Sequence, residues 1–158
     1  MKANSSGGCP MTTGVQVWEV GSGGSTLLWE GFDPQGVGFY TSGRYLWSIV
    51  RGTATILLFD VENRSEIGEL RALGPVEYAC QSTNGTLFVA CELRFPTVYK
   101  GAGELWDLKD RTRLATLEYP AAFTSDTTCA FNPDGSTLAC SGWDGSGGRV
   151  FVWDVVSR

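Results

Sequence analysis

Apolar and polar residues alternate along this chain in short segments, separated by clusters of glycine, proline, asparagine and aspartate. Alternation with a period of two puts successive side chains on opposite faces of a β-strand, and no segment keeps the longer period of a helix. The pattern therefore predicts strands throughout, at 15–20, 25–29, 37–40, 45–50, 56–60, 67–70, 76–80, 86–91, a strand ending at 105–107, 114–117, 126–131, 137–141 and 149–154.

Four of the predicted strands end in the same motif: an apolar, an aromatic, an acidic and an apolar residue. The copies lie at 17–20, 58–61, 105–108 and 152–155, and their aromatic residues are 41, 47 and 47 positions apart. A repeat with a period near 45 indicates a repeat architecture, so it outweighs the interpretation of any single segment.

The last unit carries the most features. Its alternating strand meets the turn Asn132-Pro133-Asp134-Gly135, a second strand leads to Trp143-Asp144-Gly145, and a third ends in Trp153-Asp154. This unit resembles the tryptophan–aspartate (WD) repeat of β-propellers, which has about 40–45 residues and four strands per blade. The earlier units are looser but parallel, and the resemblance covers residues 15–156. It implies an all-β fold of four-stranded antiparallel blades, about 3.5 repeats in all.

The predicted strands fall into groups of two, four, four and three, which make 13 strands. Propellers close rings of 4–8 blades, so residues 15–158 resemble an incomplete ring, the C-terminal half of a propeller, after a flexible tail at 1–14. Blades bury their faces against neighbours. We therefore expect exposed apolar faces on both terminal blades and an unpaired edge at 149–154, covered by other protein subunits.

The sequence contains no histidine, which removes histidine-based acid–base and nucleophilic schemes. Gly101-Ala102-Gly103 precedes a strand and lacks the lysine of a phosphate-binding loop. The glycine-rich stretches 21–24 and 145–148 connect strands and are interpreted as flexible turns. Without a close Cys-x-x-Cys pair, a zinc site is not expected. We expect no enzyme activity and no cofactor. Relative to the WD family, Gly74-Pro75 and Tyr119-Pro120 stand where a Gly-His pair is common, so the family's polar network cannot form in full.

The net charge of −5 and a pI near 4.7 argue against binding to nucleic acid or to anionic membranes. No run of 18 apolar residues is present, so no membrane insertion is expected.

Two pairs of cysteines lie on predicted hairpins. With turns centred at 84–85 and 133–134, Cys80 would face a position near Leu87 and Cys129 a position near Leu138. Neither Cys91 nor Cys140 would then face its neighbour, so we predict free core cysteines and no hairpin disulfide. Reduced cysteines favour an intracellular location.

Candidate binding residues lie in two places. The insertion 92–102 carries Arg94, Phe95, Tyr99 and Lys100, a combination of aromatic and cationic residues typical of binding hot spots. In WD-repeat propellers, this connection lies on a face that often binds partners. Alternatively, Phe95 and Tyr99 extend the strands of a long hairpin. The second place is the edge strand at 149–154, with Val150 and Val152. Trp29, Trp47 and Trp143 are expected to pack blades together.

The sequence therefore predicts a non-enzymatic protein–protein interaction scaffold, a subunit of a larger complex with different partner chains. One alternative is a peptide- or small-ligand-binding domain that homo-oligomerises into a closed ring. Two others are an enzyme with an active site at a subunit junction and a truncated gene product.

Overall fold

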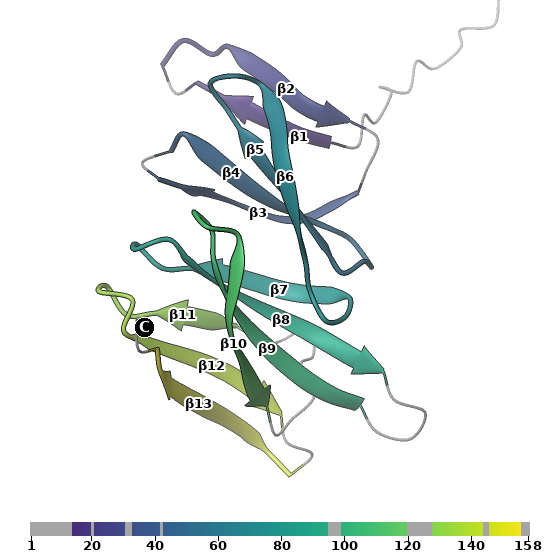
Figure 1. The fold of residues 1–158 in the computed structure, drawn as a ribbon, viewed down its shortest axis with the longest axis vertical. Helices are drawn as coiled ribbons and strands as arrows, with labels where there is room; N and C mark the ends of the chain where they lie inside the picture. Colours follow the sequence, from purple (N-terminus) through teal and green to yellow (C-terminus); the bar gives the residue numbers. More distant parts are fainter. Residues whose placement is uncertain are drawn as a thin grey trace, which may run out of the picture.

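The chain forms four antiparallel β-sheets in a row (Figure 1). A computed structural model describes residues 14–19, 21–30, 33–41, 43–94, 99–119, 128–143 and 146–155. These residues form strands only: β1 (Gly14–Trp18), β2 (Ser25–Glu30), β3 (Pro34–Tyr40), β4 (Tyr45–Val50), β5 (Thr55–Asp60), β6 (Ser65–Arg71), β7 (Val76–Gln81), β8 (Thr86–Arg94), β9 (Tyr99–Asp107), β10 (Thr112–Tyr119), β11 (Cys129–Phe131), β12 (Thr137–Trp143) and β13 (Gly148–Asp154).

Each sheet is built from strands that follow one another in the chain. The first sheet contains β1 and β2, the second β3 to β6, the third β7 to β10, and the fourth β11 to β13. The sheets do not close into a ring. The predicted all-β class, with four-stranded antiparallel blades in an incomplete ring, is confirmed. The predicted tail lies outside the described residues except for Gly14, which begins β1.

The apolar core lies between consecutive sheets. β4 and β5 are buried along most of their length because neighbouring sheets cover both faces of the second sheet. Leu58 packs toward the third sheet, whereas the adjacent residue Phe59 packs toward the first sheet. Alternate residues of a strand point to opposite faces, so one apolar run supplies two interfaces.

Hydrogen bonds also join neighbouring sheets. The indole nitrogen of Trp47 donates to the side-chain oxygen of Gln81, and the Gln81 amide donates to the carbonyl of Phe39. Trp47 is 4% exposed, which confirms its expected role in packing blades. Trp29 makes an edge-on contact with Phe59, with ring centroids 5.9 Å apart. Thus two of the three tryptophans predicted to pack blades do so; the side chain of the third lies outside the described residues.

The acidic residues of the repeated motif shape the turns that follow. Asp60 accepts hydrogen bonds from the backbone nitrogen of Asn63 at 3.0 Å and from Arg44 at 3.2 Å. The Asn63 backbone bond, and then the Arg44 and Asn63 side chains, hold the pKa of Asp60 below its usual value, against the opposing effect of burial. Asp107 accepts two backbone bonds in the equivalent turn. In both turns an arginine has a positive φ, 52° at Arg64 and 56° at Arg111.

A buried glutamate links three elements of the third sheet region. Glu104 is 0% exposed and accepts hydrogen bonds from Arg113 Nη1 at 2.7 Å and from the backbone nitrogen of Leu73 at 3.0 Å. Leu73 lies in the connection between β6 and β7. The Cys91 thiol lies 3.5 Å from a carboxylate oxygen of Glu104. Burial, followed by the Glu104 charge, raises the pKa of the Cys91 thiol to about 12. Glu104 on β9 therefore joins the β6–β7 connection to β10.

Gly38 leaves room for the ring of Trp47 on the neighbouring strand. A Cβ atom at position 38 would lie 2.7 Å from two carbons of that ring. Because Trp47 is buried, Gly38→Ala is expected to displace it and to lower the free energy of unfolding by about 1–3 kcal/mol. Urea denaturation measures this, with Gly148→Ala as the control, since a Cβ there meets no atom within 4 Å. Equal stability of both variants would contradict the expected clash.

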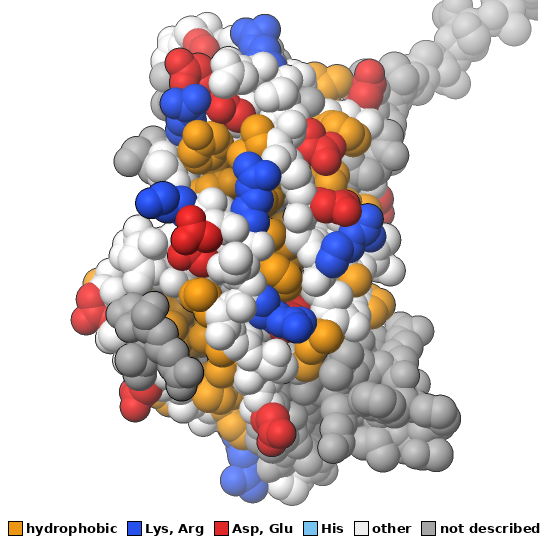
Figure 2. Space-filling view, viewed as in Figure 1, with side chains coloured by type: hydrophobic (Ala, Val, Ile, Leu, Met, Phe, Trp, Pro, Cys, Tyr) orange, Lys and Arg blue, Asp and Glu red, His pale blue; other side chains and the backbone are white. Residues whose placement is uncertain are grey.

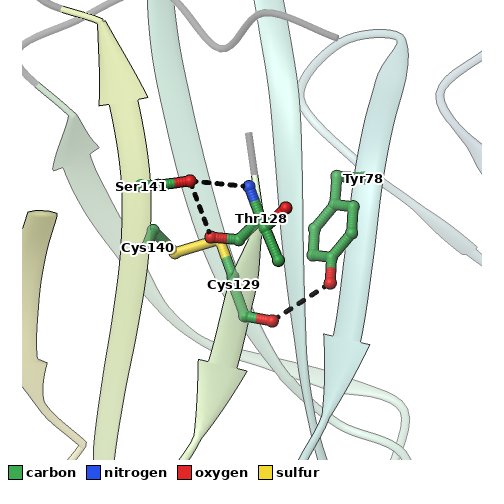
Figure 3. The surroundings of a disulfide bond; sticks show 5 residues. All are labelled: Tyr78, Thr128, Cys129, Cys140 and Ser141. Atoms are coloured by element: carbon green, nitrogen blue, oxygen red, sulfur yellow. Dashed lines mark hydrogen bonds between the residues drawn. A yellow bond between two sulfur atoms is a disulfide. The ribbon is translucent and has the colours of Figure 1, made fainter. Parts of the chain in front are cut away.

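One cysteine prediction is wrong. Cys129 and Cys140 are direct partners on β11 and β12 and form a disulfide (Figure 3). The adjacent pair, Thr128 and Ser141, is linked by a backbone hydrogen bond of 2.9 Å. In antiparallel strands such pairs alternate with non-hydrogen-bonded pairs, whose side chains lie closer together, and the two cysteines occupy one of these. The hydroxyl of Tyr78 in the third sheet donates to the Cys129 carbonyl at 3.0 Å.

The length and position of the turn explain the error. In the fourth sheet, the backbone bond from Asn132 to Thr137 closes the hairpin, and the two cysteines lie three residues outside this pair on each strand. The turn is therefore not centred at 133–134, and the register differs from the predicted one by two positions. The expectation of an intracellular location depended on reduced cysteines, and this pair removes that support.

The other hairpin has the same cysteine spacing and the opposite outcome. Its closing pair is Ser82 and Thr86, so Cys80 lies two residues before the turn and Cys91 five residues after it. Cys80 consequently faces Phe88, and both cysteines are free, as predicted. Burial raises the pKa of the Cys80 thiol to about 12.

Candidate interaction surfaces

The edge strand at the C-terminal end of the row exposes two valines. β13 pairs with β12 on one side and with no described strand on the other. Val150 is 70% exposed and Val152 is 63% exposed, and because they are two residues apart they share one face. The edge-strand surface, defined by Val150, Val152 and the open side of β13, thus lies where the sequence predicted it.

The predicted cluster around the 92–102 insertion is partly visible. β8 extends to Arg94 and β9 begins at Tyr99, and these two residues pair, as do Leu93 and Lys100. The backbone therefore continues the hairpin strands through Arg94, Tyr99 and Lys100, as in the alternative interpretation. Phe95 lies outside the described residues, and the side chains of the other three are not described. Their role in protein binding stays a prediction.

The residues of a third surface were not among the binding residues predicted from the sequence. A groove of about 570 Å³ runs between β1 and β3. Its lining includes Val15 and Val17 from β1, and Val37 and Phe39 from β3, and none of the described lining residues is charged. Val37 is 55% exposed and Phe39 is 46% exposed. We call it the β1–β3 groove. The predicted grouping of the strands could have indicated this groove, because a first sheet of two described strands leaves the next sheet partly uncovered.

The face shown in Figure 2 carries hydrophobic side chains at the surface, interleaved with both signs of charge. The exposed ion pairs of the described residues include Arg51 with Asp33 at 2.7 Å and Arg71 with Glu69 at 2.8 Å. Exposed pairs of this kind contribute little to stability.

Among the described residues, no group of three or more histidine, cysteine, aspartate or glutamate side chains is placed to hold a metal ion. The described part of the chain also contains no helix long and apolar enough to cross a membrane.

The fold matches solved structures, although no family model and no curated protein matches the sequence. A chain in the crystal structure of the mitotic checkpoint complex superposes with a TM-score of 0.70 at 21% identity, over 90% of this chain and 42% of that one. Hydrazine synthase from Kuenenia stuttgartiensis gives a TM-score of 0.66 at 16% identity, over 82% of this chain and 37% of that one.

Both similar structures have β-propeller-type folds, so this chain has a β-propeller-type fold. It spans about two fifths of the length of either chain. At these identities the likeness shows the fold alone. One of the two belongs to a checkpoint complex and the other to an enzyme, and a shared fold does not decide between such roles.

Proposed function

We propose that this chain is a non-enzymatic protein–protein interaction scaffold built from WD-type repeats, and that it acts as a structural subunit of a complex with different partner chains. The observation that carries the proposal is the edge-strand surface on β13. An open edge presents unpaired backbone donors and acceptors, and such an edge is a template for a strand from another chain.

The exposed valines add an apolar contribution to this surface. Val150 and Val152 are more exposed than apolar residues of most strands, and they face the side on which a further blade would pack. Exposed apolar faces beside an open edge are typical of protein interfaces.

The edge-strand surface predicts how the isolated chain behaves. Without its partners, the wild-type chain is expected to self-associate increasingly with concentration, without a fixed stoichiometry, because the edge is open. Replacing Val150 and Val152 with aspartate is expected to abolish most of this association, since two buried charges would oppose strand addition. Size-exclusion chromatography with light scattering measures the mass, and circular dichroism checks the fold.

Leu114→Asp is the matched control, because Leu114 is 51% exposed on β10, an outer strand of the third sheet that is not part of the edge-strand surface. This variant is expected to associate like the wild type. A discrete oligomer of fixed mass would contradict the proposal and favour a homo-oligomeric ring that binds a peptide or a small ligand. A monomer at every concentration would contradict the assignment of β13 as an interaction surface.

A further inference from the structure

The repeat shows what normally covers the face of a blade's inner strand, which is its first strand in the chain: β3 in the second sheet and β7 in the third. Leu46 on β4 pairs with the motif aromatic Phe59, and Leu87 on β8 pairs with the motif aromatic Trp106. Leu46 also pairs with Phe39, and Leu87 also pairs with Gln81. Phe39 and Gln81 therefore occupy the same position in consecutive sheets. By the same register, Val37 corresponds to Ala79.

In the third sheet this position is covered by the preceding sheet. Trp47 of β4 donates to the Gln81 side chain, and Gln81 in turn donates to a β3 carbonyl. Ala79 packs against the core cluster that includes Trp47. An inner-strand face is thus covered by the first two strands of the blade before it, with a bulky aromatic side chain at the contact.

The second sheet lacks this cover. The motif aromatic of the first sheet, Trp18, lies on β1, as Phe59 lies on β5, so β1 and β2 correspond to the third and fourth strands of a blade. Among the described residues no strand occupies the place of the first two. Val37 is 55% exposed and Phe39 is 46% exposed, whereas Ala79 and Gln81, at the equivalent positions of the third sheet, are partly buried.

The β1–β3 groove lies where the first two strands of a complete blade would stand beside β1. Residues of β1 line one side and residues of β3 line the other. The side of β1 away from β2 pairs with no described strand. An open edge beside an apolar face is the arrangement used in strand addition, in which backbone bonds supply affinity and alternate side chains supply specificity.

We propose that the β1–β3 groove binds a β-hairpin of another protein chain, one strand of which pairs antiparallel with β1 and places a bulky aromatic side chain over Val37 and Phe39. This inference depends on the proposed scaffold function and names the chemistry of one partner segment. Because none of the described residues that line the groove is charged, the inward face of the hairpin is apolar. The chain's own β3–β4 hairpin has these properties and serves as the template.

A synthetic peptide with the sequence of residues 33–50, labelled with a fluorophore, tests the proposal by anisotropy with the full chain. We expect saturable binding, at least tenfold weaker for the chain variant Val37→Asp and for the second variant Phe39→Lys. Both positions are substantially exposed, so circular dichroism is expected to show folded variants. Leu114→Asp is the matched chain control and is expected to bind like the wild type. A peptide with Trp47→Ser is expected to bind at least tenfold more weakly.

Several results would overturn the proposal. They are the absence of saturable binding to the folded wild-type chain, equal binding by the wild type and both groove variants, and loss of binding in the Val150→Asp, Val152→Asp chain. The last result would place the peptide on β13. A discrete dimer that Val37→Asp dissociates would identify a second copy as the occupant. If the β13 variant loses self-association while no peptide binds, the scaffold function stands and the groove assignment fails.

Discussion

Replacing Arg113 with methionine is expected to lower the free energy of unfolding by about 3 kcal/mol. Glu104 is fully buried, and Arg113, which also lies 6.0 Å from the centre of the Trp106 ring, is its only described cation partner. Removing one member of a buried pair leaves an uncompensated charge and typically costs 3–5 kcal/mol. The expected loss is at the low end because Arg113 is 41% exposed, so water already screens part of the interaction.

Urea denaturation followed by tryptophan fluorescence measures this change. Arg51→Met is the control, because Arg51 and Asp33 form an ion pair of the same 2.7 Å length with both side chains more than half exposed. It is expected to lose less than about 1 kcal/mol. Adding Glu104→Gln to the Arg113 variant is expected to recover stability, since the amide still accepts the Leu73 bond without a charge. If Arg113→Met and Arg51→Met lower the free energy of unfolding by the same amount, the Arg113–Glu104 pair behaves as a surface ion pair.

Replacing Cys129 and Cys140 with alanine is expected to lower the free energy of unfolding by about 3 kcal/mol. The bond joins residues 11 positions apart, and closing a loop of that length restricts the unfolded chain by about this amount. The same loss is expected for the wild-type chain in a reducing agent, whereas the double variant is expected to be insensitive to it. Denaturation with and without dithiothreitol gives all four values.

Cys80→Ala is the control for cysteine removal, because Cys80 is free and packs against the same core cluster that contains the disulfide. This variant is expected to keep the full response to the reducing agent. Alkylation of the unfolded, unreduced chain gives an independent check, in which Cys80 and Cys91 react and the disulfide pair does not. Labelling of Cys129 and Cys140 under those conditions would contradict the disulfide.

The strand grouping could be predicted because it depends on local signals. The motif aromatics at Trp18, Phe59, Trp106 and Trp153 mark the third strand of every blade, and the turns between them have the residues that turns require. The open edge at 149–154 followed from the number of predicted strands in the last group alone. Element bounds were less accurate: β3 begins at Pro34 and not at 37.

The disulfide could not be predicted because a register depends on the closing pair of a turn. Two cysteine pairs with the same spacing differ only in how many residues lie between each cysteine and that closing pair. The role of Glu104 was missed for a related reason. Its partners, Leu73 and Arg113, lie 31 and 9 residues away in sequence, and only the packed sheets bring the three together.

The row of sheets also determines how the molecule gains and loses order as a whole. Each core cluster of the described residues joins only two consecutive sheets. Stability in such an array is a sum of terms for each unit and for each junction between neighbours. The second and third sheets each have two junctions and the outer sheets have one, so opening starts at the ends and travels inward. A chain bound at either end adds a junction there and makes the whole array more cooperative, even at sheets that it never contacts.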